Sequence, residues 1–167
     1  MAKEIVRAIV VGAAGRMGMR VLAAIHESPN VFLAAAVERP DHPSLGRDIG
    51  EIAGLERWNI PLSGALKEVI PSGDVVIEFT NAEASLKDLR MVAENGKSAV
   101  IGSTGFSASQ TQEIQVLTRK IPCVLSPNMS VGVNVMFGIR LRRRIPIRHG
   151  PCLEKPREHR PHPVRAQ

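Results

Sequence analysis

Apolar residues fall in short runs and helical repeats that alternate from the beginning of the chain. Residues 6–11 are almost all apolar, which is typical of a strand covered on both faces. The residues after a short glycine-rich segment predict a helix that ends at residue 27, because its apolar positions have helical spacing: they are Met17, Val21, Leu22 and Ile25. A second apolar run at 31–37 predicts another strand.

The same alternation continues to residue 125. Residues 39–59 are rich in Pro, Gly, Asp and Ser and predict a long surface connection with one helical turn near 48–53. Further strands are expected at 59–62, 74–79, 97–101 and 121–125, and helices at 65–70, 82–95 and 107–120. Gly96 follows the second of these helices at the position where a left-handed residue is favoured. Strands that alternate with helices predict an α/β fold, a doubly wound parallel sheet with helices on both faces.

The glycine-rich segment between the first strand and helix has the pattern of a dinucleotide-binding turn. It reads Gly12-Ala13-Ala14-Gly15-Arg16-Met17-Gly18. In such a turn the first glycine permits the sharp bend, the second lets the backbone approach a pyrophosphate, and the third allows the helix to pack close to the strand. The N–H groups of the helix N-terminus then bind the phosphates. The alternative is a strand-turn-helix whose glycines serve packing alone.

An acidic residue supports the dinucleotide interpretation. Glu38 ends the second strand, twenty residues beyond Gly18, where a carboxylate accepts hydrogen bonds from the adenosine ribose. Arg39 follows it directly, and a guanidinium at this place can pair with a ribose 2′-phosphate. We therefore expect a cofactor of the NADH or NADPH type and acceptance of both.

Three later strand ends share small, hydroxyl-bearing or amide-bearing residues: Phe79-Thr80, Gly102-Ser103-Thr104-Gly105 and Ser126-Pro127-Asn128-Met129. The carboxyl ends of parallel strands lie at one edge of a sheet, where ligands bind. We expect these segments to form the floor for a nicotinamide, with hydrogen bonds from Ser103, Thr104 and Asn128. Glycines that only form turns are the alternative for each segment taken alone.

Charge divides the 167 residues into two parts. The formal net charge is +6 and the isoelectric point is near 10.0, but residues 1–138 carry 13 Lys and Arg against 14 Asp and Glu. Residues 139–167 carry 9 Lys and Arg against Glu154 and Glu158, together with five prolines. We expect one dinucleotide-binding domain at 1–138 and a basic, disordered tail at 139–167.

Other site classes are less well supported. Cys123 and Cys152 do not form a disulfide framework, and the absence of a signal peptide pattern or an apolar run of membrane-spanning length predicts a cytoplasmic protein. No metal site is expected, because the tail side chains that could bind a metal fit no standard zinc spacing: they are His149, Cys152, His159 and His162. Residues 140–144 could contact phosphate backbones, but no interleaved aromatic residues accompany them, so nucleic acid is not the expected partner.

The chain resembles the 4-hydroxy-tetrahydrodipicolinate reductase family, also called dihydrodipicolinate reductase. The residues that carry the resemblance are the glycine turn 12–18, Glu38-Arg39, Phe79-Thr80, residues 100–106 and Asn128-Met129-Ser130-Val131-Gly132-Val133-Asn134. The last run is the most specific, because it has no general role in nucleotide folds. The resemblance implies a Rossmann-type fold, NAD(P)H on these loops, and hydride transfer to a cyclic dicarboxylate in the diaminopimelate and lysine pathway.

The resemblance stops near residue 138. The family's second domain, which supplies the proton donor, the carboxylate-binding groups and the oligomer contacts, has no counterpart in residues 139–167, and His159 and His162 are not assigned catalytic roles. We therefore expect no catalytic residue in this chain, cofactor binding as its main retained property, and no inherited oligomeric state. A non-catalytic nucleotide-binding module and a basic-tailed protein that associates with nucleic acid remain the alternatives.

Overall fold

The computed structural model describes residues 5–126, which contain a six-stranded parallel sheet flanked by helices. The elements in chain order are β1 (Val6–Val11), α1 (Arg16–Glu27), β2 (Val31–Val37), α2 (Ile49–Ile52), β3 (Leu62–Ser63), α3 (Leu66–Val69), η1 (Ile70–Ser72), β4 (Val75–Glu78), α4 (Ala82–Glu94), β5 (Ser98–Ile101), α5 (Ala108–Leu117) and β6 (Cys123–Leu125). Every strand pair is parallel, and the spatial order is β3-β2-β1-β4-β5-β6. This is the doubly wound Rossmann order, so the predicted fold class is confirmed.

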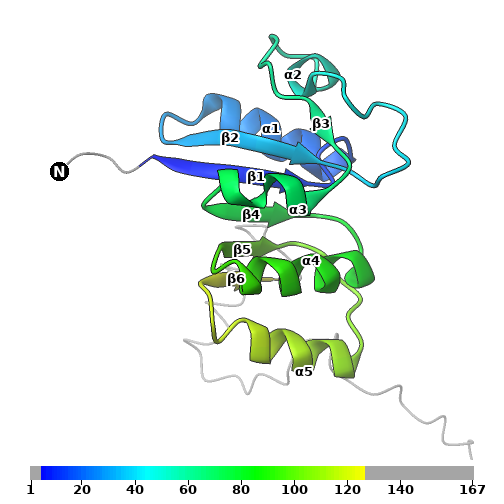
Figure 1. The fold of residues 1–167 in the computed structure, drawn as a ribbon, viewed down its shortest axis with the longest axis vertical. Coiled ribbons are helices and arrows are strands. Elements are labelled where there is room, and N and C mark those ends of the chain that lie inside the picture. Colours follow the sequence, from blue (N-terminus) through cyan, green and yellow to red (C-terminus); the bar gives the residue numbers. More distant parts are fainter. Residues whose placement is uncertain (1–4, 127–167) are drawn as a thin grey trace, which may run out of the picture. The chain divides into compact units, whose positions relative to one another are not determined.

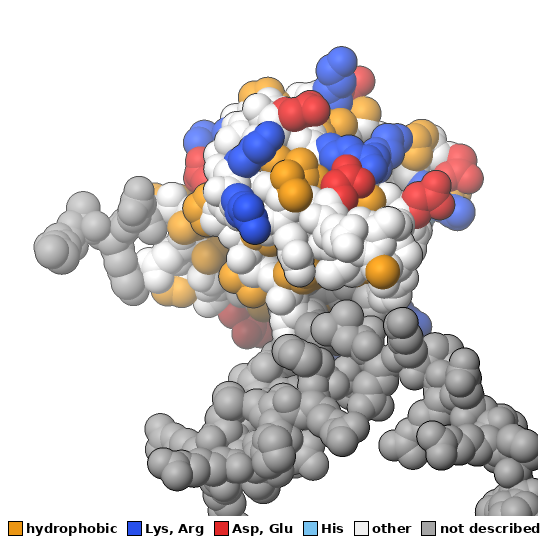
Figure 2. Space-filling view, turned by 90° about the horizontal axis from the view of Figure 1, so that it is seen from below, with side chains coloured by type: hydrophobic (Ala, Val, Ile, Leu, Met, Phe, Trp, Pro, Cys, Tyr) orange, Lys and Arg blue, Asp and Glu red, His pale blue; other side chains and the backbone are white. Residues whose placement is uncertain are grey.

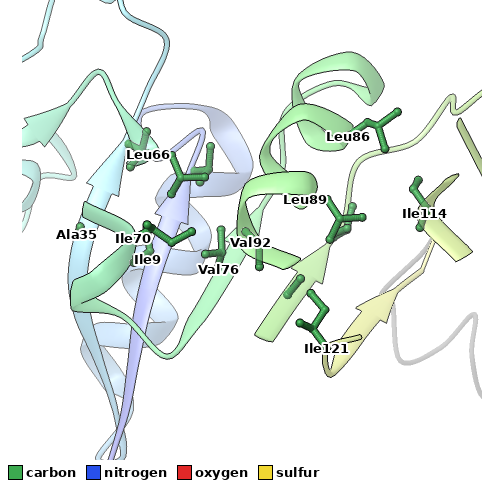
Figure 3. Close-up of a cluster of buried hydrophobic side chains, with 14 residues drawn as sticks. Ile9, Ala35, Leu66, Ile70, Val76, Leu86, Leu89, Val92, Ile114 and Ile121 are labelled. Carbon is green, nitrogen blue, oxygen red and sulfur yellow. The ribbon is translucent and has the colours of Figure 1, made fainter. Parts of the chain in front are cut away.

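Helices cover both faces of the sheet because alternate strand residues point to opposite sides. On one face, Ala8 and Val10 of β1 pack with Leu22 and Ile25 of α1. On the other face, α3, α4 and α5 pack over a cluster of fourteen buried residues. Figure 1 shows α3 and α4 in front of the sheet and α1 behind it, and Figure 3 shows α4 side chains directed into this cluster.

Most of the predicted elements are present with small shifts at their ends. Gly96 has φ +63°, as expected for the residue that follows the C-cap of α4. The strand predicted at 59–62 is wrong in its bounds, since β3 is only Leu62–Ser63. Asn59 has φ +58°, outside the extended region, and Ile60 donates its N–H to Asp48 instead of to a neighbouring strand.

Asp48 organises the long connection between β2 and β3. Its carboxylate accepts backbone N–H bonds from Gly50 and Glu51 at the start of α2, and from Trp58 and Ile60 across the loop. These four bonds hold the two sides of the loop together. The connection predicted as a surface loop with one helical turn is therefore a folded segment around one buried carboxylate.

The described residues contain no helix with the length and apolar character needed to span a membrane, and no group of three or more His, Cys, Asp or Glu side chains positioned to hold a metal ion. On the face shown in Figure 2, basic side chains lie among acidic and apolar ones and do not gather in one patch. The predicted tail at 139–167 and its histidines lie outside residues 5–126.

Candidate functional site

A pocket of about 570 Å³ lies at the carboxyl edge of the sheet. It begins at the end of β1 and extends past the ends of β2 and β4 to α3 and α4. The neighbouring strands β1 and β4 are where the strand order reverses, the place where doubly wound sheets bind ligands. The lining residues are Val11, Gly12, Gly15, Val37, Glu38, Arg39, Pro40, Gly64, Ala65, Leu66, Lys67, Phe79, Thr80, Asn81, Ala84, Lys87, Asp88 and Met91.

The glycine turn uses most of its own N–H groups to fix its shape. The N–H groups of Gly12 and Ala13 donate to the carbonyl oxygen of Val37, and that of Gly15 donates to Gly12. The first backbone hydrogen bond of α1 runs from the Met19 N–H to the carbonyl oxygen of Gly15. Gly15 is the N-cap residue and has no side chain that could accept a bond from the helix. The N–H groups of residues 16–18 therefore have no acceptor within the helix, so they can bind an anion.

Side chains at the glycine positions would disturb this arrangement. A Cβ on Gly12 would lie 3.0 Å from the Phe79 carbonyl oxygen and 3.1 Å from Cγ2 of Thr80. A Cβ on Gly18 would overlap the Gly12 carbonyl oxygen and lie 2.7 Å from Cα of Ala13. Gly12 also has φ +74°, in the left-handed region that favours glycine. Glycine at these two positions thus lets the turn pack closely on the end of β4 and on α1. At Gly15, which lines the pocket, a Cβ would meet only the Gly12 carbonyl oxygen, at 3.1 Å, so the backbone there is open to the approach of a pyrophosphate.

Glu38 joins the glycine turn to the end of β2. One carboxylate oxygen accepts the Ala14 N–H at 3.1 Å, and the other accepts the N–H of Arg39 at 3.2 Å. The carboxylate lines the pocket together with Arg39. An acceptor and a cation are therefore adjacent where a ribose with or without a 2′-phosphate would lie.

A polar network with three buried members and exposed Thr80 connects the end of β4 with α4 and the loop after β5. It is called the Glu78 network here, and its members are Glu78, Thr80, Ser85 and Ser103. The Thr80 hydroxyl donates to Glu78 Oε1 at 2.6 Å, and the Ser85 hydroxyl donates to Ser103 Oγ at 2.6 Å. Ser103 Oγ also accepts the Thr80 N–H at 3.0 Å. Thr80 and Ser85 Oγ atoms lie 3.4 Å apart.

Burial makes Glu78 an unusual carboxyl group. It is 2% exposed, and desolvation raises its pKa from 4.5 to about 7, although the hydrogen bond from the Thr80 hydroxyl acts in the opposite direction. Asp88 on α4 raises this pKa further by charge repulsion. Burial also raises the pKa of Asp88, while Lys87 lowers it. The charge of the buried Glu78 carboxyl thus changes near neutral pH.

The structure brings six of the predicted cofactor residues to the pocket lining: Gly12, Gly15, Glu38, Arg39, Phe79 and Thr80. Met17, part of the predicted apolar helix face, is instead 49% exposed at the start of α1, beside exposed Arg16. Thr104 is exposed after β5, whereas the Ser103 hydroxyl lies in the Glu78 network. Ser126 donates its N–H to Ile101. Pro127, Asn128 and Met129 lie outside the described residues, and their role stays a prediction.

Sequence reasoning missed two groups of residues. Lys67 on α3 and Lys87 and Asp88 on α4 line the pocket, because these helices begin just after the ends of β3 and β4. Glu78 and Ser85 were read as ordinary strand and helix positions. The signal for Glu78 was present, since an acidic residue within a strand buried on both faces needs a partner.

Sequence comparisons identify relatives of this chain. The family profile described as dihydrodipicolinate reductase, N-terminus, matches residues 6–129. The 4-hydroxy-tetrahydrodipicolinate reductase of Syntrophus aciditrophicus is 47% identical over 131 residues, which cover 78% of this chain and 49% of that protein. The enzyme of the same name from Citrifermentans bemidjiense is 47% identical over 134 residues, covering 80% of this chain and 50% of the relative. The chain thus spans about half the length of these relatives.

Comparison with solved structures supports the fold. Dipicolinate-bound dihydrodipicolinate reductase from Paenisporosarcina sp. TG-14 aligns with a TM-score of 0.66 and 24% identity, covering 81% of this chain and 52% of the other. An oxidoreductase from Agrobacterium radiobacter, solved in complex with NAD⁺, L-tartaric acid and magnesium, aligns with a TM-score of 0.58 and 18% identity over 71% of this chain and 34% of the other. At these identities the structures show a shared fold alone. The sequence matches carry the assignment further: this chain belongs to the dihydrodipicolinate reductase family, whose N-terminal profile covers residues 6–129.

Proposed function

We propose that this chain binds NADH or NADPH at the carboxyl edge of the sheet and supplies the cofactor-binding part of a 4-hydroxy-tetrahydrodipicolinate reductase. The glycine turn carries this proposal. Its N–H groups before α1 are satisfied within the protein, and those of residues 16–18 have no acceptor in the helix. A Cβ on Gly12 or Gly18 would crowd the protein atoms that shape the turn.

The chain's own residues have distinct tasks in this proposal. The start of α1 binds the pyrophosphate through N–H groups. Glu38 and Arg39 face the adenosine ribose, with the carboxylate favouring a free 2′-hydroxyl and the guanidinium favouring a 2′-phosphate. The loops at Phe79–Thr80 and Gly102–Thr104, with residues 126–129, frame the nicotinamide. A bound reduced dinucleotide supplies the hydride for reduction of a cyclic dicarboxylate.

Lys67 and Lys87 strengthen the case for an anionic ligand. Both line the pocket, Lys67 from α3 and Lys87 from α4. Together with Arg39 they place three cations around one cavity, against the carboxylates of Glu38 and Asp88. Since a 2′-phosphate adds about 1.5 to 2 negative charges, these cations favour acceptance of NADPH beside NADH.

Calorimetric titration of the purified chain with NADH and with NADPH tests the proposal. Binding of either nucleotide in a one-to-one ratio is the expected result, and Gly15→Val should abolish it. The matched control is Gly54→Ala, a glycine with open space around its Cβ position and outside the pocket lining. Absence of binding by the folded wild-type chain would overturn the proposal.

An assay of NADPH oxidation in the presence of the cyclic substrate addresses the family reaction. We expect the 167-residue chain to bind cofactor with little turnover, because the relatives are about twice the length of the matched region. Turnover at the rate of a full-length relative would contradict this part of the proposal and leave cofactor binding intact. A non-catalytic nucleotide-binding role corresponds to binding without any turnover, including after addition of a separately expressed second domain from a relative.

A further inference from the structure

Three loops at the carboxyl edge of the sheet are in direct contact with one another. Thr80 after β4 packs on the glycine turn after β1, where its Cγ2 lies 3.1 Å from the Cβ position of Gly12. The Phe79 ring lies against Gly102 after β5, so closely that a Cβ there would overlap the ring. The Thr80 N–H is held by the hydroxyl of Ser103. A displacement of the Thr80 segment would therefore move both of its neighbours.

The Glu78 network lies beneath these contacts. Glu78, Ser85 and Ser103 are 2%, 1% and 4% exposed. The carboxyl group holds the Thr80 hydroxyl from below, and Ser85 on α4 holds the Ser103 hydroxyl. Buried, mutually satisfied hydroxyls fix the geometry of the loops that carry them.

We propose that the Glu78 network fixes the pyrophosphate turn and the nicotinamide loop in one geometry, and that Glu78 couples dinucleotide binding to the uptake of a proton. Glu78 is thus a positioning residue, which acts on the cofactor through Thr80 and Ser103. The proposal rests on the proposed nucleotide binding at the same edge of the sheet.

The charges around Glu78 decide the direction of this coupling. The carboxyl is enclosed by Thr80, by Ser85 and Asp88 on α4, and by the ends of β1 and β5, and Asp88 is the charged group that acts on it. Lys87 neutralises part of the Asp88 charge. A dinucleotide adds negative phosphates on the other side of Thr80, which favours the neutral carboxyl group. Bound nucleotide therefore raises the pKa of Glu78 above its already raised value.

Titration with NADH at several pH values tests the coupling. NADH is the better probe because it lacks the 2′-phosphate of NADPH, whose own pKa is about 6. Affinity for NADH should fall about fivefold between about pH 6.5 and about pH 8.5. Calorimetry in buffers of different ionisation enthalpy should show uptake of roughly half a proton per NADH near pH 7.5.

Glu78→Gln is the decisive variant, because it keeps the shape and hydrogen-bonding capacity of the side chain and removes its titration. Proton uptake should disappear, and the affinity for NADH should become less dependent on pH than that of the wild type. Histidine side chains titrate in the same range, so the difference between variant and wild type is the quantity that counts. Glu94→Gln, an exposed acid on α4, is the matched control and should behave as the wild type.

Ser85→Ala separates positioning from proton coupling. It removes the hydroxyl that holds Ser103 and leaves the carboxyl of Glu78, so NADH affinity should fall several-fold while proton uptake persists. If Glu78→Gln and wild type bind NADH with equal proton uptake and equal pH dependence, the proposal is overturned while nucleotide binding stands. If neither NADH nor NADPH binds to the folded wild type, the proposed function fails and this inference with it.

Discussion

The glycine turn after β1 and the Glu78 network after β4 form two sides of the same sheet edge, but they are built in opposite ways. The turn depends on the absence of side chains: Gly12, Gly15 and Gly18 leave room, and backbone N–H groups provide the polar contacts. The network depends on side chains: the buried Glu78 carboxyl, the buried hydroxyls of Ser85 and Ser103, and the hydroxyl of exposed Thr80. The ligand edge of this sheet is thus shaped on one side by close backbone packing and on the other by hydrogen-bonded polar side chains.

The largest expected effect comes from filling the turn. Gly18→Val should destabilise the fold by about 1–3 kcal/mol, because the new side chain overlaps the Gly12 carbonyl oxygen. It should also weaken NADH binding by about a hundredfold or more, since two or more charge-assisted N–H bonds to phosphate are lost. Chemical unfolding and calorimetry measure the two effects. Gly54→Ala, at φ +72° in open space, should lower the free energy of unfolding and leave NADH affinity unchanged. Equal loss of NADH affinity in both variants would contradict the role given to the glycine turn.

The Glu78 network should make the free energy of unfolding depend on pH. The folded pKa of Glu78, about 7, lies above its ordinary value of 4.5, so its contribution to stability is fully present below pH 4.5 and is lost as the pH rises through about 7. Glu78→Gln lacks this loss. Relative to the wild type, the variant should therefore gain up to about 3 kcal/mol of unfolding free energy between these pH values.

Urea unfolding of wild type and Glu78→Gln at several pH values makes this measurement. The control is Glu94→Gln, whose difference from wild type should stay nearly constant over the same range. A constant difference for Glu78→Gln would mean that its carboxyl is ionised in the fold at neutral pH, and the contrast between turn and network would then disappear.

Glu38 contacts the glycine turn and is expected to influence the preference between NADH and NADPH. Glu38→Ala should weaken NADH binding about tenfold or more and NADPH binding less, because an ionic hydrogen bond is typically worth about 1.5–3 kcal/mol and only NADH offers a free 2′-hydroxyl. Glu38→Gln, which can still accept the Ala14 N–H, should retain the shape of the turn. Equal losses for both nucleotides in Glu38→Ala, as seen by calorimetry, would show that the carboxylate acts through the turn alone.

The smallest effect is expected at the opposite end of the sheet. The Arg7 hydrogen bond lowers the pKa of Asp74 to about 2, so this pair contributes stability above pH 3.8 that is lost as the pH falls through about 2. Asp74→Asn should slightly lower the melting temperature at neutral pH, and the difference from wild type should vanish near pH 2. Both partners are partly exposed, which limits the effect. NADH affinity should be unchanged; any change would mean that the two ends of the sheet are coupled.

The difference between the turn and the network also explains which parts of the site could be predicted. Gly12, Gly15, Gly18 and Glu38 lie at fixed spacings within one strand-turn-helix unit, so their roles can be inferred from local sequence. Local sequence could not identify Lys67 and Asp88 as pocket residues. They lie on α3 and α4, and these helices contribute to the same pocket as the glycine turn only because of the order of the strands in the sheet. Ser103 shows the same limit, since its predicted hydrogen bond to the nicotinamide competes with bonds to Thr80 and Ser85.

The alternation of strands and helices, the Rossmann-type sheet, the dinucleotide turn and the family could all be predicted from the amino-acid sequence, because each depends on periodicity and local motifs. Three features became known only from the folded chain: Asp48 closes the loop between β2 and β3, β3 begins at Leu62, and Glu78 is buried among hydroxyls from three segments. Burial and long-range hydrogen bonding depend on which segments become neighbours, and local sequence does not specify this. Residues 78, 85 and 103 meet only once β4, α4 and β5 have packed together.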